Sequence, residues 1–144
     1  MTFLVDLVDG LATLLDAEGV ATYRATGVYT ASETAITDTV MPDSPDRAVV
    51  LTAYNTTDNA ALTDCTVSVQ VRTRAGPDPR QVADLDEAVF TVLHALADAQ
   101  FGTARVGLMT RDNAAPMGRD SNGRFERVSN YTVRAQRPPT DRLE

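Results

Sequence analysis

The stretch Cys65-Thr-Val-Ser-Val-Gln-Val-Arg-Thr-Arg74 decides the fold class of this chain. Valine stands at positions 67, 69 and 71 and alternates with polar residues, which is typical of a half-buried β-strand. Upstream, Arg47-Ala-Val-Val-Leu-Thr-Ala-Tyr54 predicts a second strand, separated from the first by the polar residues 55–64. We expect these two strands to pair antiparallel within one sheet.

Two segments predict amphipathic helices. Residues 3–15 place apolar side chains at helical spacing, and Gly19 lies where a left-handed C-cap belongs. Asp78 and Pro79 predict the N-cap and first position of a second helix, which is expected to end at Gly102. Its apolar stripe consists of Val82, Leu85, Val89, Val92, Leu93 and Leu96.

The remaining segments complete an α+β order. Residues 20–29 are β-rich, 30–46 read as a loop, and 104–110 predict a strand, followed by a loop at 112–119 that contains Pro116. Asn122-Gly123 predicts a type I′ hairpin turn between a short strand near 117–121 and a final strand at 124–136. The prediction is α-β-β-β-α-β-β: an antiparallel or mixed sheet with two helices on one face, forming one domain over 1–137 with a short tail at 138–144.

Charge is unusual in this 144-residue chain. Its formal net charge is −7, all 13 basic residues are arginine, and aspartate outnumbers glutamate by 15 to 5. A GC-rich genome that favours arginine codons explains this pattern, and so does a saline host cytoplasm that favours short carboxylates. Residues 1–66 carry two arginines against ten acids, whereas residues 67–144 carry eleven against ten. Such an asymmetry suits a subunit that assembles head to tail, and an acidic protein does not bind DNA by bulk electrostatics.

The sequence offers no catalytic constellation, and we expect no enzyme activity, cofactor or metal site. The single histidine, His94, flanks an apolar helix stripe, and the single cysteine, Cys65, opens a strand as a half-buried thiol. No signal peptide or membrane-spanning run is predicted, so we expect the protein to stay in the host cytoplasm until it assembles.

Several segments, in this order, resemble the minor capsid or tail-terminator family of tailed bacterial and archaeal viruses. They are Arg47–Tyr54 after a Pro-rich approach at 41–46, Val69–Arg74, Asp78-Pro79 with the helix through Val92-Leu93-His94, Gly118–Glu126, Asn130-Tyr131 and Arg137-Pro138. The resemblance covers nearly the whole chain. It implies an α+β subunit of a hexameric ring that caps the tail tube, stops its polymerisation and joins the tail to the head or neck.

The implied partners are other copies of the chain, the tail tube protein and a head-completion or neck protein, with DNA only passing through the lumen. Exposed sheet edges could be covered by ring neighbours through strand addition. Candidate interface residues lie in or beside the predicted hairpin loops: Arg72, Arg74, Arg119, Asp120 and Arg124. Because these positions lie near strand ends, the folded subunit is expected to survive their charge reversal. Two alternatives are a head-completion or neck connector and a non-viral binding module.

Overall fold

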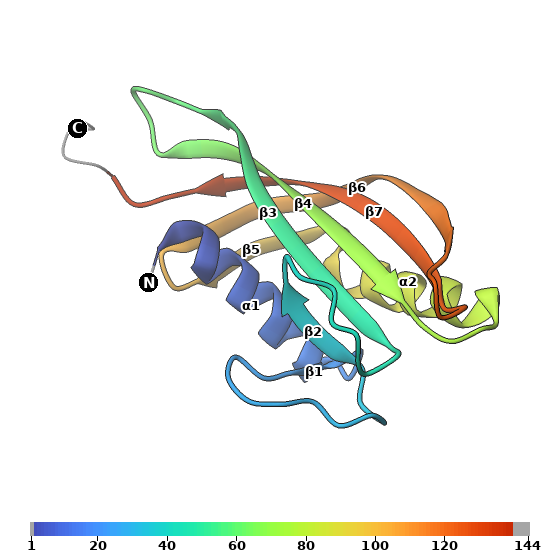
Figure 1. Cartoon of the computed structure of the whole chain (residues 1–144). Helices are drawn as coiled ribbons and strands as arrows, with labels where there is room; N and C mark the ends of the chain where they lie inside the picture. Colours follow the sequence, from blue (N-terminus) through green and yellow to red (C-terminus); the bar gives the residue numbers. More distant parts are fainter. Residues whose placement is uncertain (1, 140–144) are drawn as a thin grey trace.

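The computed structural model describes residues 2–139, and within them the chain forms two helices and one seven-stranded sheet (Figure 1). The elements are α1 (Phe3–Ala17), β1 (Thr22–Tyr23), β2 (Ala35–Asp38), β3 (Ala48–Asp58), β4 (Asp64–Arg74), α2 (Pro79–Leu93), β5 (Leu96–Phe101), β6 (Ala104–Arg119) and β7 (Phe125–Gln136). The strand order is β1-β2-β3-β4-β7-β6-β5. Of the predicted tail, residues 140–144 lie outside the described part of the chain.

The sheet is mixed, and its pairing follows the predicted centre. β3 and β4 pair antiparallel, β4 continues to β7 and β7 to β6, whereas β1, β2 and β3 are parallel neighbours. Both helices cover one face (Figure 1). The three valines of β4 are fully buried beneath them, as are Leu7, Leu11 and Leu15 of α1. The predicted α+β class, with two helices on one face of a mixed sheet, is confirmed.

The predicted strand at 20–29 and loop at 30–46 were placed wrongly. Only Thr22 and Tyr23 form β1, and β2 lies inside the predicted loop. β2 exists because Ala35 and Ile36 are almost completely buried and pair in parallel with Ala48 and Val49 of β3. Two such residues are too short a pattern for periodicity to detect, so tertiary burial decides the structure here.

The second helix is shorter than predicted and is followed by a strand. α2 ends at Leu93, and Ala95 (φ 67°) turns the chain into β5, which pairs antiparallel with β6. β6 then runs through Pro116, where a loop was expected. β5 pairs with β6 only as far as Met109. Beyond that residue β6 is an edge strand, the position in a sheet that tolerates proline.

The predicted hairpin near Asn122-Gly123 is present, but its turn type differs. The Gly123 amide donates to the Asp120 carbonyl (3.0 Å), and the Asp120 amide donates to the Arg124 carbonyl (2.9 Å). Gly123 has a φ of 78°, whereas the φ of Asn122 is not positive, as a type I′ turn would require. The connection is therefore a three-residue loop closed by a left-handed glycine, and the predicted type I′ turn is wrong.

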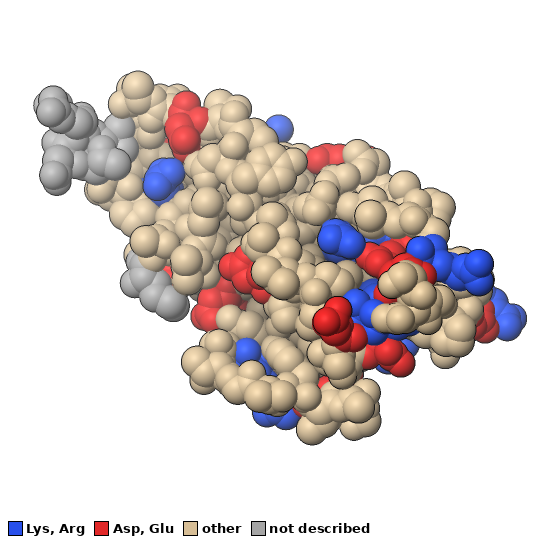
Figure 2. All heavy atoms as spheres, viewed as in Figure 1, with Lys and Arg blue, Asp and Glu red and all other residues tan. Residues whose placement is uncertain are grey.

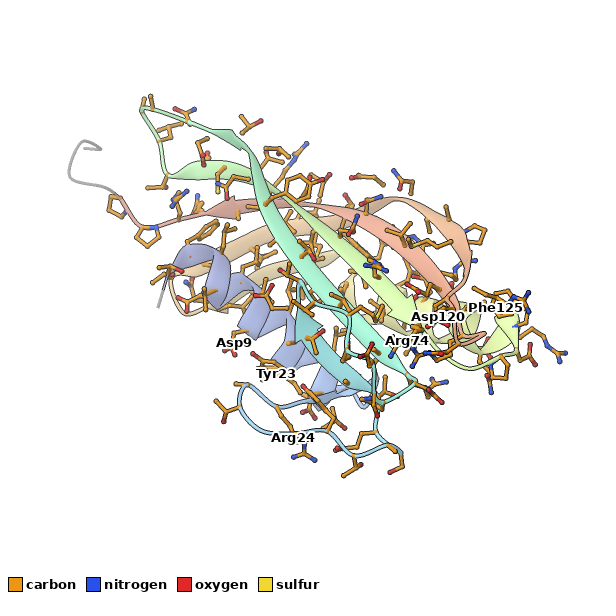
Figure 3. All side chains as sticks on the ribbon, in the orientation of Figure 1. Asp9, Tyr23, Arg24, Arg74, Asp120 and Phe125 are labelled. Carbon is orange, nitrogen blue, oxygen red and sulfur yellow. The ribbon has the colours of Figure 1, made fainter. Side chains whose placement is uncertain are left out.

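Polar contacts also fix α1 to the sheet. The Asp6 carboxylate, buried on the inner side of α1, accepts hydrogen bonds from the Thr103 amide (2.7 Å) and hydroxyl (2.5 Å) in the β5–β6 turn. These bonds, the hydroxyl's first, lower the pKa of Asp6. Near the middle of the helix, the Tyr23 hydroxyl of β1 points to Asp9 and donates to it at 2.8 Å (Figure 3). α1 is thus fixed at two places by carboxylates that appear in the sequence as interruptions of its apolar pattern.

Candidate subunit interface

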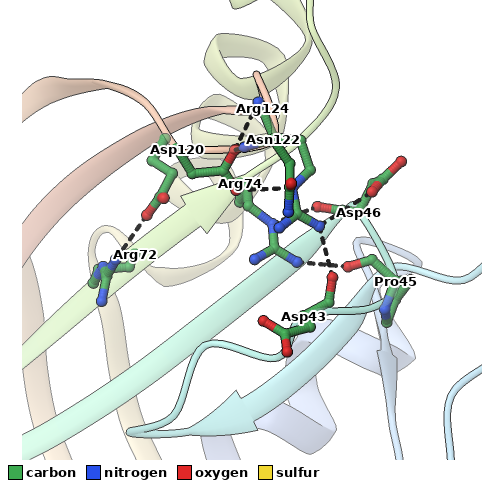
Figure 4. A network of polar contacts seen from close by, with 9 residues as sticks. Asp43, Pro45, Asp46, Arg72, Arg74, Asp120, Asn122 and Arg124 are labelled. Atoms are coloured by element: carbon green, nitrogen blue, oxygen red, sulfur yellow. Dashed lines mark hydrogen bonds and ion pairs between the residues drawn. The ribbon is translucent and has the colours of Figure 1, made fainter.

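Four of the five candidate interface residues converge at one end of the sheet (Figure 4). Arg72 and Arg74 lie at the C-terminal end of β4, and Asp120 and Arg124 flank the β6–β7 hairpin loop. They meet the loop at 43–46 that leads into β3. Arg119 stands apart at the end of β6, exposed to solvent. The register of β4 with β7 places these residues together, because Arg72 and Arg74 lie opposite Val128 and Glu126.

Arg124 is buried and uses its donors inside the subunit. Its Nε atom donates to Asp120 Oδ2 at 2.8 Å, and its Nη1 atom donates to the Asp43 carbonyl at 2.6 Å and to Asp46 Oδ1 at 3.2 Å. Only 8% of the residue is exposed. Hydrogen bonds to a charged donor are stronger than neutral ones, so this guanidinium holds the hairpin against the 43–46 loop.

Arg74 binds the same loop from the β4 side. Its Nε atom donates to the Asp46 carbonyl at 2.8 Å and its Nη2 atom to the Pro45 carbonyl at 2.7 Å. The residue is 2% exposed, and burial, followed by the neighbouring Arg124, lowers the pKa of its guanidinium. We refer to Asp43, Pro45, Asp46, Arg74, Asp120 and Arg124 as the arginine corner.

Asp120 caps the hairpin loop as well as pairing with Arg124. Its Oδ1 atom accepts from the backbone amides of Asn122 (3.0 Å) and Arg124 (2.9 Å). These bonds, the Arg124 amide's first, lower the pKa of Asp120. The arrangement is an aspartate-initiated turn with a second function, because the other carboxylate oxygen orients the buried guanidinium.

Arg72 and Arg119 differ from the buried pair. Arg72 donates to Glu126 Oε1 at 2.7 Å across β4 and β7, and 32% of its side chain is exposed. Arg119 is exposed and its guanidinium lies 5.9 Å from the Phe125 ring centroid. Arg74 and Arg124 are therefore interior residues of this corner, although all four arginines lie near strand ends as the sequence predicted.

A second polar cluster, not foreseen from the sequence, joins α2 to the sheet. Buried Asp86 accepts from the Ser129 hydroxyl at 2.6 Å, and Arg111 and Arg127 approach its carboxylate at 3.5 and 3.4 Å. Burial raises the pKa of the neighbouring Tyr131 to about 12. The spacing of Asp84 and Asp86 could have suggested one inward carboxylate, since residues two apart on a helix point in different directions. Its arginine partners lie on strands and give no local signal.

The two residues considered for catalysis are held by ordinary packing. His94 caps α2, stacks on Phe90 with 4.6 Å between ring centroids, and accepts the Arg111 amide at Nδ1 (3.0 Å). Cys65 is buried in β4, which raises the pKa of its thiol. Within residues 2–139 no three His, Cys, Asp or Glu side chains gather as a metal site. In the same part of the chain, no helix has the length and apolar character needed to cross a membrane.

The opposite end of β3 and β4 carries exposed apolar side chains. We define residues 52–68, which form this end of the two strands and their hairpin loop, as the arm; its tip extends beyond the helices, whereas Cys65 and Val67 are still buried in the core (Figure 1). Tyr54 is 51% exposed and Leu62, at the tip, is 56% exposed. A groove of about 490 Å³ runs from the arm across the sheet to β5 and is lined by polar residues that include Asp64, Asp98, Arg105 and Arg134. Figure 2 shows charged side chains gathered at the corner end and few of them over β3 and the arm.

Comparison with known proteins gives matches to one family model and to solved structures. The model of the bacteriophage tail terminator protein family matches residues 14–137. Among solved structures, a chain of the virion of a native gene transfer agent particle is similar, with a TM-score of 0.62 and 16% identity, over 90% of this chain and 97% of that chain. At this identity the second match concerns the fold alone. The comparison with curated protein sequences gives no match.

Proposed function

Because the chain belongs to the bacteriophage tail terminator protein family, we propose that it forms a closed ring that caps the tail tube. In that position it stops tube polymerisation and offers the surface to which the head or neck attaches. The observation that carries this proposal is the family match over residues 14–137. As a member of this family the chain is a structural component of a virion. We propose that it performs no chemical step and needs no cofactor.

The form of the subunit supports a ring. Its acidic residues divide evenly, ten in residues 1–66 and ten in 67–144, whereas eleven of its 13 arginines follow residue 66, so the two parts carry net charges of −8 (2 − 10) and +1 (11 − 10). A head-to-tail, heterologous contact that closes after six copies would bring unlike charges together at every boundary. Of the candidate interface residues, Arg119 is exposed and Arg72 is half-buried against Glu126, and we propose that these two face a neighbouring subunit. Arg74, Asp120 and Arg124 would shape that surface from within.

The proposed partners are further copies of the chain, the tail tube protein and a head-completion or neck protein. DNA would pass through the lumen without being read, since a chain with net charge −7 has no bulk attraction for phosphates. Before assembly we expect the protein in the host cytoplasm and afterwards at the head–tail junction of the virion.

Loss of the gene tests the function. A terminator occupies the growing end of the tube, so particles without this protein should yield heads without tails beside free tubes of abnormal length. Electron microscopy of lysates measures both, and the gene supplied in trans should restore joined particles with normal tails. Tails of normal length in the deletion, joined to heads, would refute the proposal. Normal-length free tails beside tailless heads would instead support a neck connector.

Symmetry tests the ring separately. The proposal expects one hexameric layer of this protein at the head-proximal end of each tail, visible by cryo-electron microscopy. Isolated protein can remain monomeric because heterologous contacts often close only on a template. A single copy per tail, or a stack of many layers, would contradict the ring.

A further inference from the structure

The sheet ends in open strand edges whose chemistry differs. An edge presents unpaired amides and carbonyls, and proteins usually guard such edges with prolines, charges or bulges. On one side, β2 pairs with β3 only as far as Leu51, so among the described residues 2–139 no strand pairs with residues 52–58 of β3 on that side. On the other side, β5 pairs with β6 only as far as Met109, which leaves residues 110–119 of β6 open.

The open part of β6 is guarded. Pro116 lacks an amide hydrogen, and register shifts interrupt the strand at 111–113 and 116–118. Gly118 has a φ of 83°, and charged Arg111 and Arg119 lie near the two ends. β5, the last strand on this side, carries the exposed Asp98 at a φ of 53°. These devices oppose pairing with a further strand.

The open part of β3 has few such devices. Its sequence, Thr-Ala-Tyr-Asn-Thr-Thr-Asp, contains no proline and no charge before Asp58, and it is rich in residues that favour strands. The Leu51 carbonyl accepts the Thr39 amide on the β2 side, so by alternation the peptide groups of Ala53 and Asn55 point to the open side. One register shift, between Asn55 and Thr57, follows these two residues.

We propose that residues 52–58 of β3 receive an extended segment of a second copy of this chain by strand addition. Charge favours a second copy as the occupant, because the edge belongs to the part of the chain with two arginines against ten acids, whereas residues 67–144 of a second copy carry eleven arginines against ten acids. The proposal rests on the proposed ring and adds the backbone contact that joins its subunits. The arginine corner, at the far end of the same strands, then holds β3 and β4 in place for this contact.

A proline pair tests the edge. Asn55→Pro removes an amide that points to the open side of β3, and Ala114→Pro does the same on the guarded edge of β6, two residues from Pro116. Each variant is supplied in trans to particles that lack the protein. We expect Asn55→Pro to lower the yield of joined, normal-length tails by about tenfold or more, the cost of one lost hydrogen bond at each boundary. Ala114→Pro should restore tails as the wild type does.

A second measurement does not depend on how Asn55→Pro folds. In wild-type protein, the amides of Ala53 and Asn55 should exchange with solvent deuterium more slowly in assembled tails than in isolated subunits, by a factor of about ten or more. Equal exchange in both states, or full restoration by Asn55→Pro, would overturn the edge proposal. Either result would leave the terminator function intact, because that function is decided by the deletion.

Discussion

The two ends of β3 and β4 contrast with each other. At one end, Arg74 and Arg124 are buried and bind backbone carbonyls of the 43–46 loop. At the other end, the arm carries exposed Tyr54 and Leu62 and an open strand edge. The strands are continuous and their side chains alternate in the same way along β4. The difference therefore comes from what covers each end and not from the strands themselves.

This contrast separates two ways in which a small subunit uses polar groups. A buried guanidinium must be fully bonded, because an unpaired charge in the interior is costly. The corner supplies acceptors for two nitrogens of each guanidinium inside one chain. Within the described residues, the arm leaves a strand edge unpaired and apolar side chains exposed, which is the condition in which a neighbour can contribute most.

The largest expected effect is at the corner. Arg124→Met removes the guanidinium that bonds Asp120 and the Asp43 carbonyl and leaves the Asp120 carboxylate without its charged partner. Hydrogen bonds to a charged group typically contribute about 1.5–3 kcal/mol, and we expect a loss of unfolding free energy of that order. Chemical denaturation of the purified subunit measures the loss. Arg119→Met, in which the lost side chain is exposed, is the matched control and should change stability by about 0.5 kcal/mol or less.

Equal losses for Arg124→Met and Arg119→Met would contradict the division between interior and surface arginines. The sequence alone led to the opposite expectation, that charge reversal at these positions leaves the fold intact. For Arg74 and Arg124, whose guanidiniums are buried, we now expect charge reversal to unfold the corner.

Acid should weaken the corner through Asp120. Its pKa is lowered in the folded state, chiefly by the Arg124 amide, so its contribution is present above the unfolded pKa of about 3.9 and disappears as pH falls through the lower folded value. Asp120→Asn lacks this titration. The stability difference between wild type and Asp120→Asn should therefore be largest near neutral pH and shrink below about pH 4. A difference independent of pH would show that the carboxylate acts through its shape and not its charge.

At the arm, by contrast, substitution should leave the isolated subunit almost unchanged. Leu62→Ser replaces a side chain that is 56% exposed at the tip, so the free energy of unfolding should change by about 0.5 kcal/mol or less. Leu7→Ser, at a fully buried position of α1, provides the opposite extreme and should cost several times more. Denaturation curves measure both. Strong destabilisation by Leu62→Ser would mean that the arm is part of the core.

Long patterned segments allowed the sequence to predict α1, the β3–β4 pair and the α+β class, because burial of one face imposes a repeat on the residues. The same reasoning missed β2 and β5, which are four and six residues long and depend on neighbours distant in the chain. It placed Arg119 and Arg124 beside a hairpin loop correctly, whereas Arg72 and Arg74 precede the turn into α2 and no hairpin, and it could not identify the partners of any of them. The acceptors of Arg74 are the Pro45 and Asp46 carbonyls, and a carbonyl is common to every residue and leaves no mark in a sequence.

The smallest expected effect separates the two explanations of the lysine-free, aspartate-rich composition. Exposed pairs such as Arg24–Glu33 are screened by salt, whereas the corner is buried and should respond little. Screening is essentially complete near 1 M, where the Debye length is about 3 Å. A saline host predicts that the melting temperature continues to rise above this concentration, because short carboxylates then hold water and counterions at the surface. Codon bias predicts a plateau below it.

Arg124→Met should show the same salt dependence as the wild type, starting from a lower melting temperature, because the contacts that it lacks are interior. A variant that lost the salt dependence would place the effect in the corner and contradict the division between the two ends.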